Sequence, residues 1–188
     1  MTATSVRVLI AFHTAEGQTK KIADYIAGLL GRSGAEVDLH PVDLAPSPAR
    51  YDAVVVGDSI HLAHHSKGLK DYLLQHAAAL EVVPSALFQV SITSIDTDAE
   101  HVAKAREMVD TLLEQTGFRP DAVGLFAGSL AYTKYGWAKR RMVAAIAQKA
   151  GLDTNTTRDR EYTDWNIVAG FAAEVLALAT AHGIAKAT

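Results

Sequence analysis

The sequence predicts an α/β fold in which helices cover both faces of a five-stranded parallel sheet. Short, continuous apolar runs recur along the 188 residues, and amphipathic helical patterns separate them. Apolar runs without alternation are typical of strands that are buried on both faces. Strands that alternate with helices form a doubly wound sheet with right-handed crossovers. We therefore expect one domain spanning residues 1–188.

The five predicted strands differ in their pattern. Residues 35–42 alternate apolar and polar positions, with Val37 and Leu39 on one face, which indicates a more peripheral strand. The other four predicted strands are apolar runs at residues 6–12, 53–57, 86–90 and 122–127.

Helical patterns lie between and after these runs, because apolar residues recur at spacings of three and four. Thr163 is the predicted N-cap of the last helix, and Asp164 is favourable in its first turn. The connection over residues 129–162 is much longer than a link from strand to helix requires, so it predicts a helical insert with a helix near 137–150. The four apolar stripes are Ile22, Ile26, Leu29 and Leu30; Leu69, Tyr72, Leu73 and Leu80; Val102, Ala105, Val109 and Leu112; and Ile167, Phe171, Val175 and Leu178.

Composition excludes several classes of function. The formal net charge is −3, so no overall positive field would recruit nucleic acid. The chain has no cysteine, which excludes disulfides, thiolate catalysis and cysteine-held clusters. No uninterrupted apolar run approaches the ~18 residues of a spanning helix. These features predict a cytoplasmic protein.

The segment HTAEGQT (residues 13–19) follows the first predicted strand and opens a helix. A phosphate there would meet backbone N–H groups and the positive end of the helix dipole. Thr14 and Thr19 can donate hydroxyl hydrogen bonds, and Gly17 permits a left-handed turn. The segment lacks the lysine of nucleoside-triphosphate loops and the G-x-G-x-x-G of dinucleotide sites. The alternative is an ordinary helix start after a strand.

The segment TAEGQT resembles the phosphate loop of flavodoxins, where hydroxyl residues and one glycine wrap the phosphate of flavin mononucleotide (FMN). More narrowly, GDSIHLAHHSKGLKDYL, GFRPDAVGLFAGSLAYTKYGW and REYTDW together resemble the menaquinone-dependent protoporphyrinogen IX dehydrogenases, a branch of the flavodoxin-like fold. The resemblance covers nearly the whole chain in order. It implies a flavodoxin-like sheet, FMN as cofactor, and oxidation of protoporphyrinogen IX to protoporphyrin IX with a membrane quinone as electron acceptor.

Glu16 precedes the loop glycine, at a position where ordinary flavodoxins usually carry threonine. An acidic residue at this position resembles the pattern of the dehydrogenase branch. Because a phosphate would repel this carboxylate, we expect Glu16 to face solvent or to pair with Lys20 or Lys21. The phosphate would then depend on backbone amides, Thr14, Gln18 and Thr19.

Two further loops are expected beside the flavin ring, because ligands of open α/β sheets bind beyond the carboxyl ends of the strands. These loops are DSIHLAHHS (58–66) and SITSIDTD (91–98), and neither contains Trp, Tyr or Phe. His61 or Leu62 would cover one face of the ring, and the other face would stay open to a flat substrate. The predicted FMN-binding residues are Thr14, Ala15, Glu16, Gly17, Gln18, Thr19, Ser59, Ile60, His61, Leu62, Ser91, Ile92 and Thr93.

The histidines of the first of these loops allow two interpretations. His61, His64 and His65 would suit zinc or copper, but no cysteine supports a metal site and a loop is the only scaffold. We therefore expect loop histidines that face solvent or flavin, and no metal. His64 matches a histidine of the resembled family, which makes it the candidate for proton transfer near the flavin.

The insert has an uneven charge distribution, since residues 122–152 contain five basic residues and no acidic one. A basic helix with flanking aromatic residues suits an anionic membrane surface or an anionic flat ligand. A solvated basic face on a self-packed insert is the simpler alternative. The resemblance favours porphyrinogen binding and peripheral contact with the inner face of the cell membrane. The candidate substrate residues are Tyr132, Lys134, Tyr135, Trp137, Arg140 and Arg141.

Two other functions stay open at this point. A flavodoxin-type electron carrier is one, although such carriers usually present a strongly acidic face. An NAD(P)H:quinone reductase is the other, because a transient hydride donor needs no obvious nicotinamide site.

Overall fold

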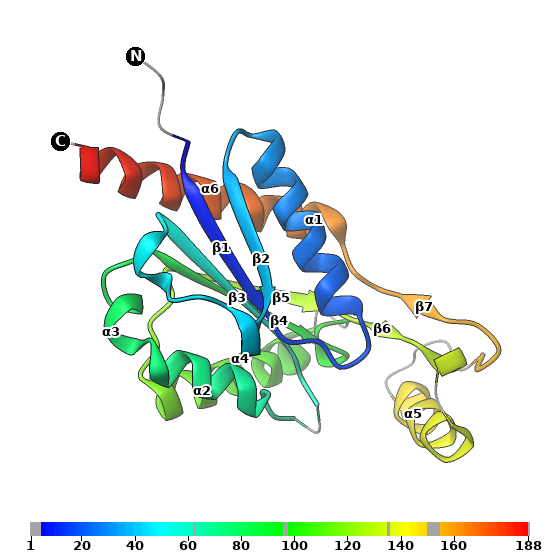
Figure 1. Cartoon of the computed structure of the whole chain (residues 1–188). Helices are drawn as coiled ribbons and strands as arrows, with labels where there is room; N and C mark the ends of the chain where they lie inside the picture. Colours follow the sequence, from blue (N-terminus) through cyan, green and yellow to red (C-terminus); the bar gives the residue numbers. More distant parts are fainter. Residues whose placement is uncertain (1–4, 62, 96–97, 135, 150–154, 188) are drawn as a thin grey trace.

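The computed structural model describes residues 5–61, 63–95, 98–134, 136–149 and 155–187. Five strands form a parallel sheet in the order β2-β1-β3-β4-β5 (Figure 1). This confirms the predicted doubly wound architecture. The strands are β1 (Arg7–Phe12), β2 (Glu36–Pro41), β3 (Ala53–Ser59), β4 (Ser85–Ser91) and β5 (Ala122–Ala127).

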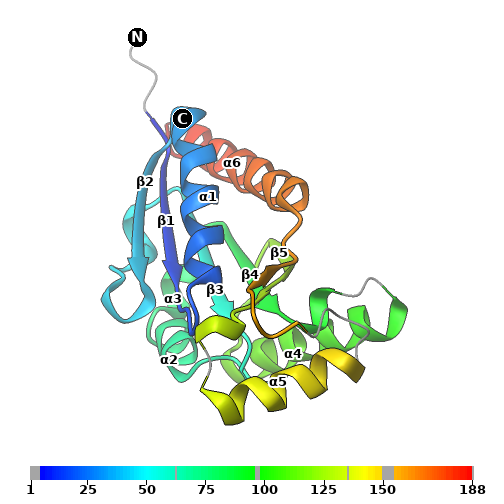
Figure 2. The same ribbon diagram turned by 90° about the vertical axis from the view of Figure 1, so that its right-hand side faces the viewer.

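Helices cover both faces of the sheet (Figures 1 and 2). α1 (Gln18–Arg32) and α6 (Trp165–Ala187) pack on one face, while α2 (Lys67–Gln75), α3 (Ala77–Leu80) and α4 (Ala99–Thr116) pack on the other. Successive side chains of β1 point to opposite faces of the sheet, so Ile10 belongs to one apolar cluster and Leu9 to the other. Both residues are completely buried, as a strand covered on two faces requires.

The centre of the sheet contains a close contact between Gly57 and Phe88. A Cβ atom on Gly57 would lie 2.1 Å from the Phe88 ring, so only glycine leaves room for that ring. Phe88 also packs against Phe126 and Phe171, with ring centroids 5.7 and 6.3 Å away. This aromatic cluster joins β3, β4, β5 and α6.

The insert leaves the sheet after β5 and returns before α6. Its short strands β6 (Ser129–Leu130) and β7 (Arg160–Glu161) pair antiparallel. Its helix α5 (Trp137–Lys149) confirms the helix predicted near 137–150 and lies beyond the carboxyl-terminal end of the sheet (Figures 1 and 2). The buried cluster of the insert is Leu130, Ala131, Tyr132, Val143 and Ala147. The described residues also form the 3-10 turns η1 (Val42–Leu44), η2 (Pro48–Arg50), η3 (Thr93–Ile95) and η4 (Tyr132–Lys134).

The start of α6 differs from the prediction by one residue. Asp164, not Thr163, caps the helix, because its Oδ1 accepts a hydrogen bond from Asn166 N at 2.8 Å. The Thr163 hydroxyl instead donates to Ala127 O at 2.7 Å. The predicted apolar stripe was also wrong at Ile167, which is 57% exposed because its neighbour takes the inward position. The buried stripe is Val168, Phe171, Ala172, Val175 and Ala179.

α6 is also more apolar than its interrupted sequence pattern suggests. Residues Trp165–Lys186 are long and apolar enough, by length and composition alone, to cross a membrane, with a mean hydropathy of 1.7. No uninterrupted apolar run marks this segment in the sequence, because Glu174 and other polar residues divide it. In the structure α6 packs its buried stripe against the sheet, as the core helix of an α/β domain does.

Candidate functional site

The loop between β1 and α1 is held in a defined conformation. Gly17 has φ 100°, a left-handed value that favours glycine. Its N–H donates to Thr14 Oγ1 at 2.9 Å, and Ala15 N donates to Ser59 Oγ at 3.2 Å. The expected phosphate loop is therefore fixed at its glycine and tied to the end of β3.

Thr19 carries the feature that fits an anion. It is 1% exposed, and its Oγ1 has no hydrogen-bond partner within the described residues. A buried hydroxyl without a partner costs free energy, so such groups in native proteins call for an explanation. Thr19 lies in the first turn of α1, where backbone N–H groups lack intrahelical partners. This arrangement fits the phosphate of FMN.

The ion pairs around this loop differ from those expected. Lys20 pairs with Asp24 and Lys21 with Glu161, so the two cations expected to pair with Glu16 have other carboxylate partners. Glu16 is half-buried. It borders a cavity of about 310 Å³ between the loop and the β6–β7 pair. The cavity is lined by Glu16, Gly17, Gln18, Lys21, Ser129, Ala131, Asp159, Arg160 and Glu161.

Gln18 connects the loop to the return of the insert. Its Nε2 donates to Thr163 Oγ1 at 2.8 Å, across 145 positions of sequence. Because Thr163 in turn donates to Ala127 O, the start of α1, the end of β5 and the segment before α6 are joined by one chain of hydrogen bonds. The local sequence does not reveal this link between Gln18 and Thr163.

The loop after β3 makes a tight turn at the carboxyl edge of the sheet. Ile60 N donates to Val90 O at 2.9 Å, which anchors the start of the loop to β4. His61 and His64 exchange backbone hydrogen bonds of 3.1 and 3.0 Å, and Ala63 between them has φ 62°. Both histidine side chains are exposed, which places the proton-transfer candidate His64 at the surface of this turn. Leu62 lies outside the described residues.

Asp58 is a functional candidate that the sequence analysis missed. Its side chain is completely buried at the end of β3. Asp58 Oδ1 lies 2.9 Å from His13 Nδ1, and Oδ2 lies 3.1 Å from His65 Nδ1. Ser66 N donates to Oδ2 at 2.7 Å. The available signal was a charged residue near the end of the apolar run AVVVGDS. β3 includes this residue, whereas the predicted strand ended at Gly57.

The pKa values of this cluster move in the directions that a carboxylate–imidazole pair requires. Burial raises the pKa of Asp58, but the hydrogen bonds from His13, His65 and Ser66 outweigh it, so the pKa lies below the ordinary value. The hydrogen bond to Asp58 raises the pKa of His13 above its usual 6.5, against the opposing effect of burial, and the charge of Asp43 adds to the rise. The structure therefore holds a carboxylate anion beside a readily protonated imidazole.

The second ring loop starts where β4 ends. Ser91 is buried, and its Oγ lies 2.8 Å from Ser94 Oγ and accepts a hydrogen bond from Ser94 N at 3.1 Å. Thr93 lies in η3, and Ile92 packs against the insert cluster. This loop thus meets the insert, whereas the first ring loop meets the phosphate loop.

The predicted substrate residues of the insert have different environments. Tyr132 is 0% exposed, so it belongs to the insert core and has no surface for a substrate, which corrects its predicted role. Trp137 is 78% exposed, and Arg141 is exposed as well. Tyr135 lies outside the described residues, as do the side chains of Lys134 and Arg140.

Metal binding gains no support from the arrangement. Within the described residues, no group of three or more His, Cys, Asp and Glu side chains could hold a metal ion. His65 is drawn into the Asp58 cluster, away from the exposed His61 and His64.

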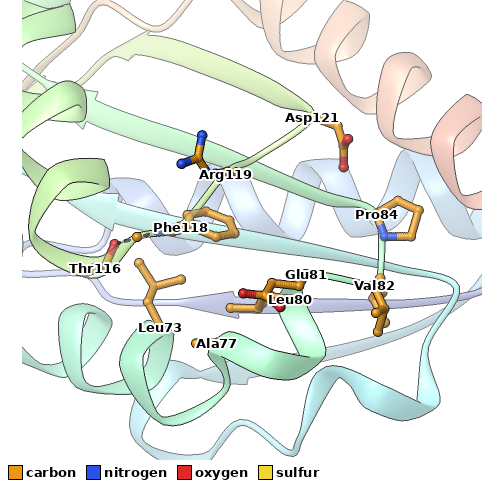
Figure 3. Close-up of a pocket in the computed structure, with 12 residues that line it drawn as sticks. Leu73, Ala77, Leu80, Glu81, Val82, Pro84, Thr116, Phe118, Arg119 and Asp121 are labelled. Atoms are coloured by element: carbon orange, nitrogen blue, oxygen red, sulfur yellow. Dashed lines mark hydrogen bonds between the residues drawn. The ribbon is translucent and has the colours of Figure 1, made fainter.

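A second cavity, of about 290 Å³, lies at the opposite edge of the sheet (Figure 3). Apolar residues such as Leu73 and Phe118 line it beside Arg119 and Asp121. Its lining includes Pro84, directly before β4, and Asp121, directly before β5, so it belongs to the amino edge. Because open α/β sheets bind ligands at the carboxyl edge, we separate this cavity from the candidate flavin site.

Comparison with known proteins identifies the class. Residues 9–157 match the family described as Flavodoxin domain. The chain belongs to this family, and it is an FMN-binding oxidoreductase of the flavodoxin type.

Individual relatives identify the branch of the flavodoxin family. The chain is 33% identical over 172 residues to the protoporphyrinogen IX dehydrogenase [quinone] of Escherichia coli K12, which covers 90% of this chain and 94% of the relative. It is 33% identical over 182 residues to the dehydrogenase of the same name from Leishmania major, which covers 95% of this chain and 78% of the relative. The structure of a WrbA-like flavodoxin from Agrobacterium tumefaciens matches with a TM-score of 0.53 at 13% identity, over 95% of this chain and 99% of that chain, and supports the fold. The chain thus belongs to the dehydrogenase branch of the family.

Proposed function

We propose that this protein oxidises protoporphyrinogen IX to protoporphyrin IX with bound FMN and passes the electrons to a quinone, as a step of heme biosynthesis. The observation that carries the proposal is the 33% identity over 90% of the chain to an enzyme of that name. The carboxyl edge of the sheet supports it with a fixed loop and the unpartnered buried hydroxyl of Thr19.

Each loop has a proposed task. Backbone amides, Thr14 and Thr19 hold the phosphate, with Gly17 setting the turn, and the loops after β3 and β4 flank the ring. FMN supplies an acceptor for two electrons when it is bound. The chain itself binds and orients the flavin. Neither ring loop contains Trp, Tyr or Phe, so one face of the flavin site stays open to a flat tetrapyrrole.

The insert is the proposed surface for substrate and membrane. Trp137 is exposed at the start of α5, one turn before the exposed Arg141. An exposed indole with neighbouring basic residues suits the interface of an anionic membrane. A guanidinium also pairs well with carboxylates, which a porphyrinogen carries on its propionate groups. We infer a peripheral position on the inner face of the cell membrane, where the quinone is reached.

The activity is tested with FMN-loaded protein and menaquinone, supplied either with protoporphyrinogen IX or with NAD(P)H. Protoporphyrin IX fluorescence and quinone reduction are measured together. Anaerobic turnover with porphyrinogen alone as donor supports the proposal. Turnover with NAD(P)H and none with porphyrinogen would make the protein a quinone reductase, and turnover with neither would leave an electron carrier.

Arg141 gives the insert its own test. We expect Arg141→Glu to raise the KM for protoporphyrinogen about tenfold, because a charge-assisted hydrogen bond contributes roughly 1.5–3 kcal/mol. FMN content should not change. The matched control is Arg119→Glu, another exposed arginine, at the amino edge of the sheet. Cosedimentation with anionic vesicles separates the two roles of the insert, and wild-type KM together with wild-type vesicle binding would leave only a solvated basic face.

A further inference from the structure

We propose that His13, Asp58 and His65 form a proton-holding network that couples the protonation of this protein to its affinity for the phosphate of FMN. The proposal rests on the assignment of FMN as cofactor and concerns positioning residues that act through the phosphate loop. Its basis is the placement of two imidazole side chains, from the loops after β1 and β3, around one buried carboxylate.

The network adjoins the phosphate loop and the loop after β3. His13 immediately precedes Thr14 of the phosphate loop, and Asp58 immediately precedes Ser59, whose Oγ accepts the hydrogen bond of Ala15 N. His65 immediately precedes Ser66, the N-cap of α2. A change in the charge or position of Asp58 therefore acts on both loops at once.

The two imidazoles differ in their exposure to solvent. The His65 side chain is 2% exposed, and its Nε2 is buried without a hydrogen-bond partner in the described part of the chain. Its Nδ1 lies 3.1 Å from Asp58 Oδ2, so Asp58 is the polar partner of this ring.

His13 is the member that exchanges a proton. Its side chain is 36% exposed, so its second ring nitrogen can be hydrated while Nδ1 donates to Asp58. The charged groups that act on it are the carboxylates of Asp58 and Asp43, and both favour the imidazolium. Asp58 in turn faces His13, His65 and the backbone N–H of Ser66.

The sign of the coupling follows from these charges. With His13 protonated, the imidazolium balances the charge of Asp58. Because the pKa of His13 is raised, this state extends above its ordinary value of 6.5. As the pH rises through the raised pKa, the carboxylate of Asp58 loses the balancing charge of His13 and repels the phosphate in the neighbouring loop. By linkage, bound FMN holds the proton on His13 more tightly by the same factor.

The test compares two flavins on the apoprotein. We expect the dissociation constant of FMN to rise roughly three- to tenfold between pH 6 and 9, the order given by unit charges several ångströms apart near a protein surface. Riboflavin, which lacks the phosphate, should show no such rise. The second ionisation of a phosphate monoester, near pH 6, changes phosphate charge in the direction that strengthens binding, so it cannot imitate the expected weakening.

Variants separate this coupling from a structural role. Asp58→Asn should shift the midpoint of the FMN curve to lower pH, because the carboxylate that holds the proton is gone. His13→Gln keeps a donor to Asp58 and should give weaker FMN binding that no longer depends on pH in this range. The matched control is His76→Gln, a partly buried histidine directly after α2 whose ring is tilted by 58° against that of Tyr72, and this variant should keep the wild-type curve. A purely structural role would weaken FMN and riboflavin alike at every pH.

Histidine NMR provides an independent measurement that needs no variant. The pKa of His13 should rise when FMN is added and that of His76 should not. An FMN affinity that is flat with pH, or a His13 pKa that FMN leaves unchanged, overturns the coupling while the cofactor assignment stands. Failure to bind FMN at any pH overturns the cofactor assignment and the coupling together.

Discussion

The parallel sheet and the insert are held in place by different interactions. The sheet buries residues on both faces, and Val8, Leu9, Ile10 and Ala11 of β1 are all completely buried. The insert has one cluster of five buried residues and depends on polar links, such as the Lys21–Glu161 ion pair and the hydrogen bonds from Thr133 to Asp159 at 2.8 and 2.9 Å. The candidate flavin site thus rests on a rigid edge, whereas the proposed substrate surface belongs to a weakly anchored element that can open locally.

The largest effect is expected in the sheet. Phe88→Ala should lower the free energy of unfolding by about 3–5 kcal/mol, because it removes a completely buried ring from the aromatic cluster and leaves a cavity. Urea unfolding followed by circular dichroism measures it. A loss below about 1 kcal/mol would mean that the cluster is not the centre of the core.

An intermediate effect is expected in the insert. Leu130→Ala removes a completely buried side chain from the small cluster, which should cost roughly 2–3 kcal/mol locally. Because the insert can open before the sheet, hydrogen exchange should speed up in residues 129–149 and stay slow in β1 and β3. Equal acceleration in both regions would show that the insert and the sheet unfold as one unit.

The smallest effect is expected at the link between the two regions. Lys21→Met removes the partner of Glu161 and the cation 5.2 Å from the Trp165 ring, and should lower stability by at most about 1 kcal/mol. Burial raises the pKa of Glu161, but the hydrogen bond and the charge of Lys21, together with hydrogen bonds from Trp165 and Gln18, outweigh this and hold the pKa below its usual value. The ion pair therefore contributes above the unfolded pKa and is lost as the pH falls through the folded one.

Unfolding at pH 7 and pH 3 checks this dependence on pH. The cost of Lys21→Met should be present at pH 7 and should shrink at pH 3. Lys20→Met is the control, since its partner Asp24 lies in the same helix. A loss for Lys21→Met that is equal at both pH values would mean that packing, and not charge, holds the insert here.

The sheet could be predicted because the residues of each strand form a recognisable local pattern. A run such as residues 6–12 is apolar because both faces are covered, and α5 was expected from the length and pattern of its own segment. The Asp58 network could not be predicted in the same way, because His13 and Asp58 are 45 positions apart and meet only when β1 and β3 pair. Tyr132 was misjudged for a related reason. An aromatic residue beside basic ones looks like a binding surface until the fold places α5 over it.

The position of α6 in the chain has a consequence for synthesis. It supplies Val168, Phe171, Ala172, Val175 and Ala179 to one face of the sheet, and Lys186 Nζ near its end donates to Tyr51 O at 3.0 Å and Asp52 Oδ1 at 3.2 Å. All five strands leave the ribosome before this helix does, so on this face the growing polypeptide has only α1 as cover until α6 emerges. At 5–20 residues per second, the 23 residues of α6 take roughly one to five seconds to add. During that interval the nascent sheet is a natural client for a chaperone at the tunnel exit.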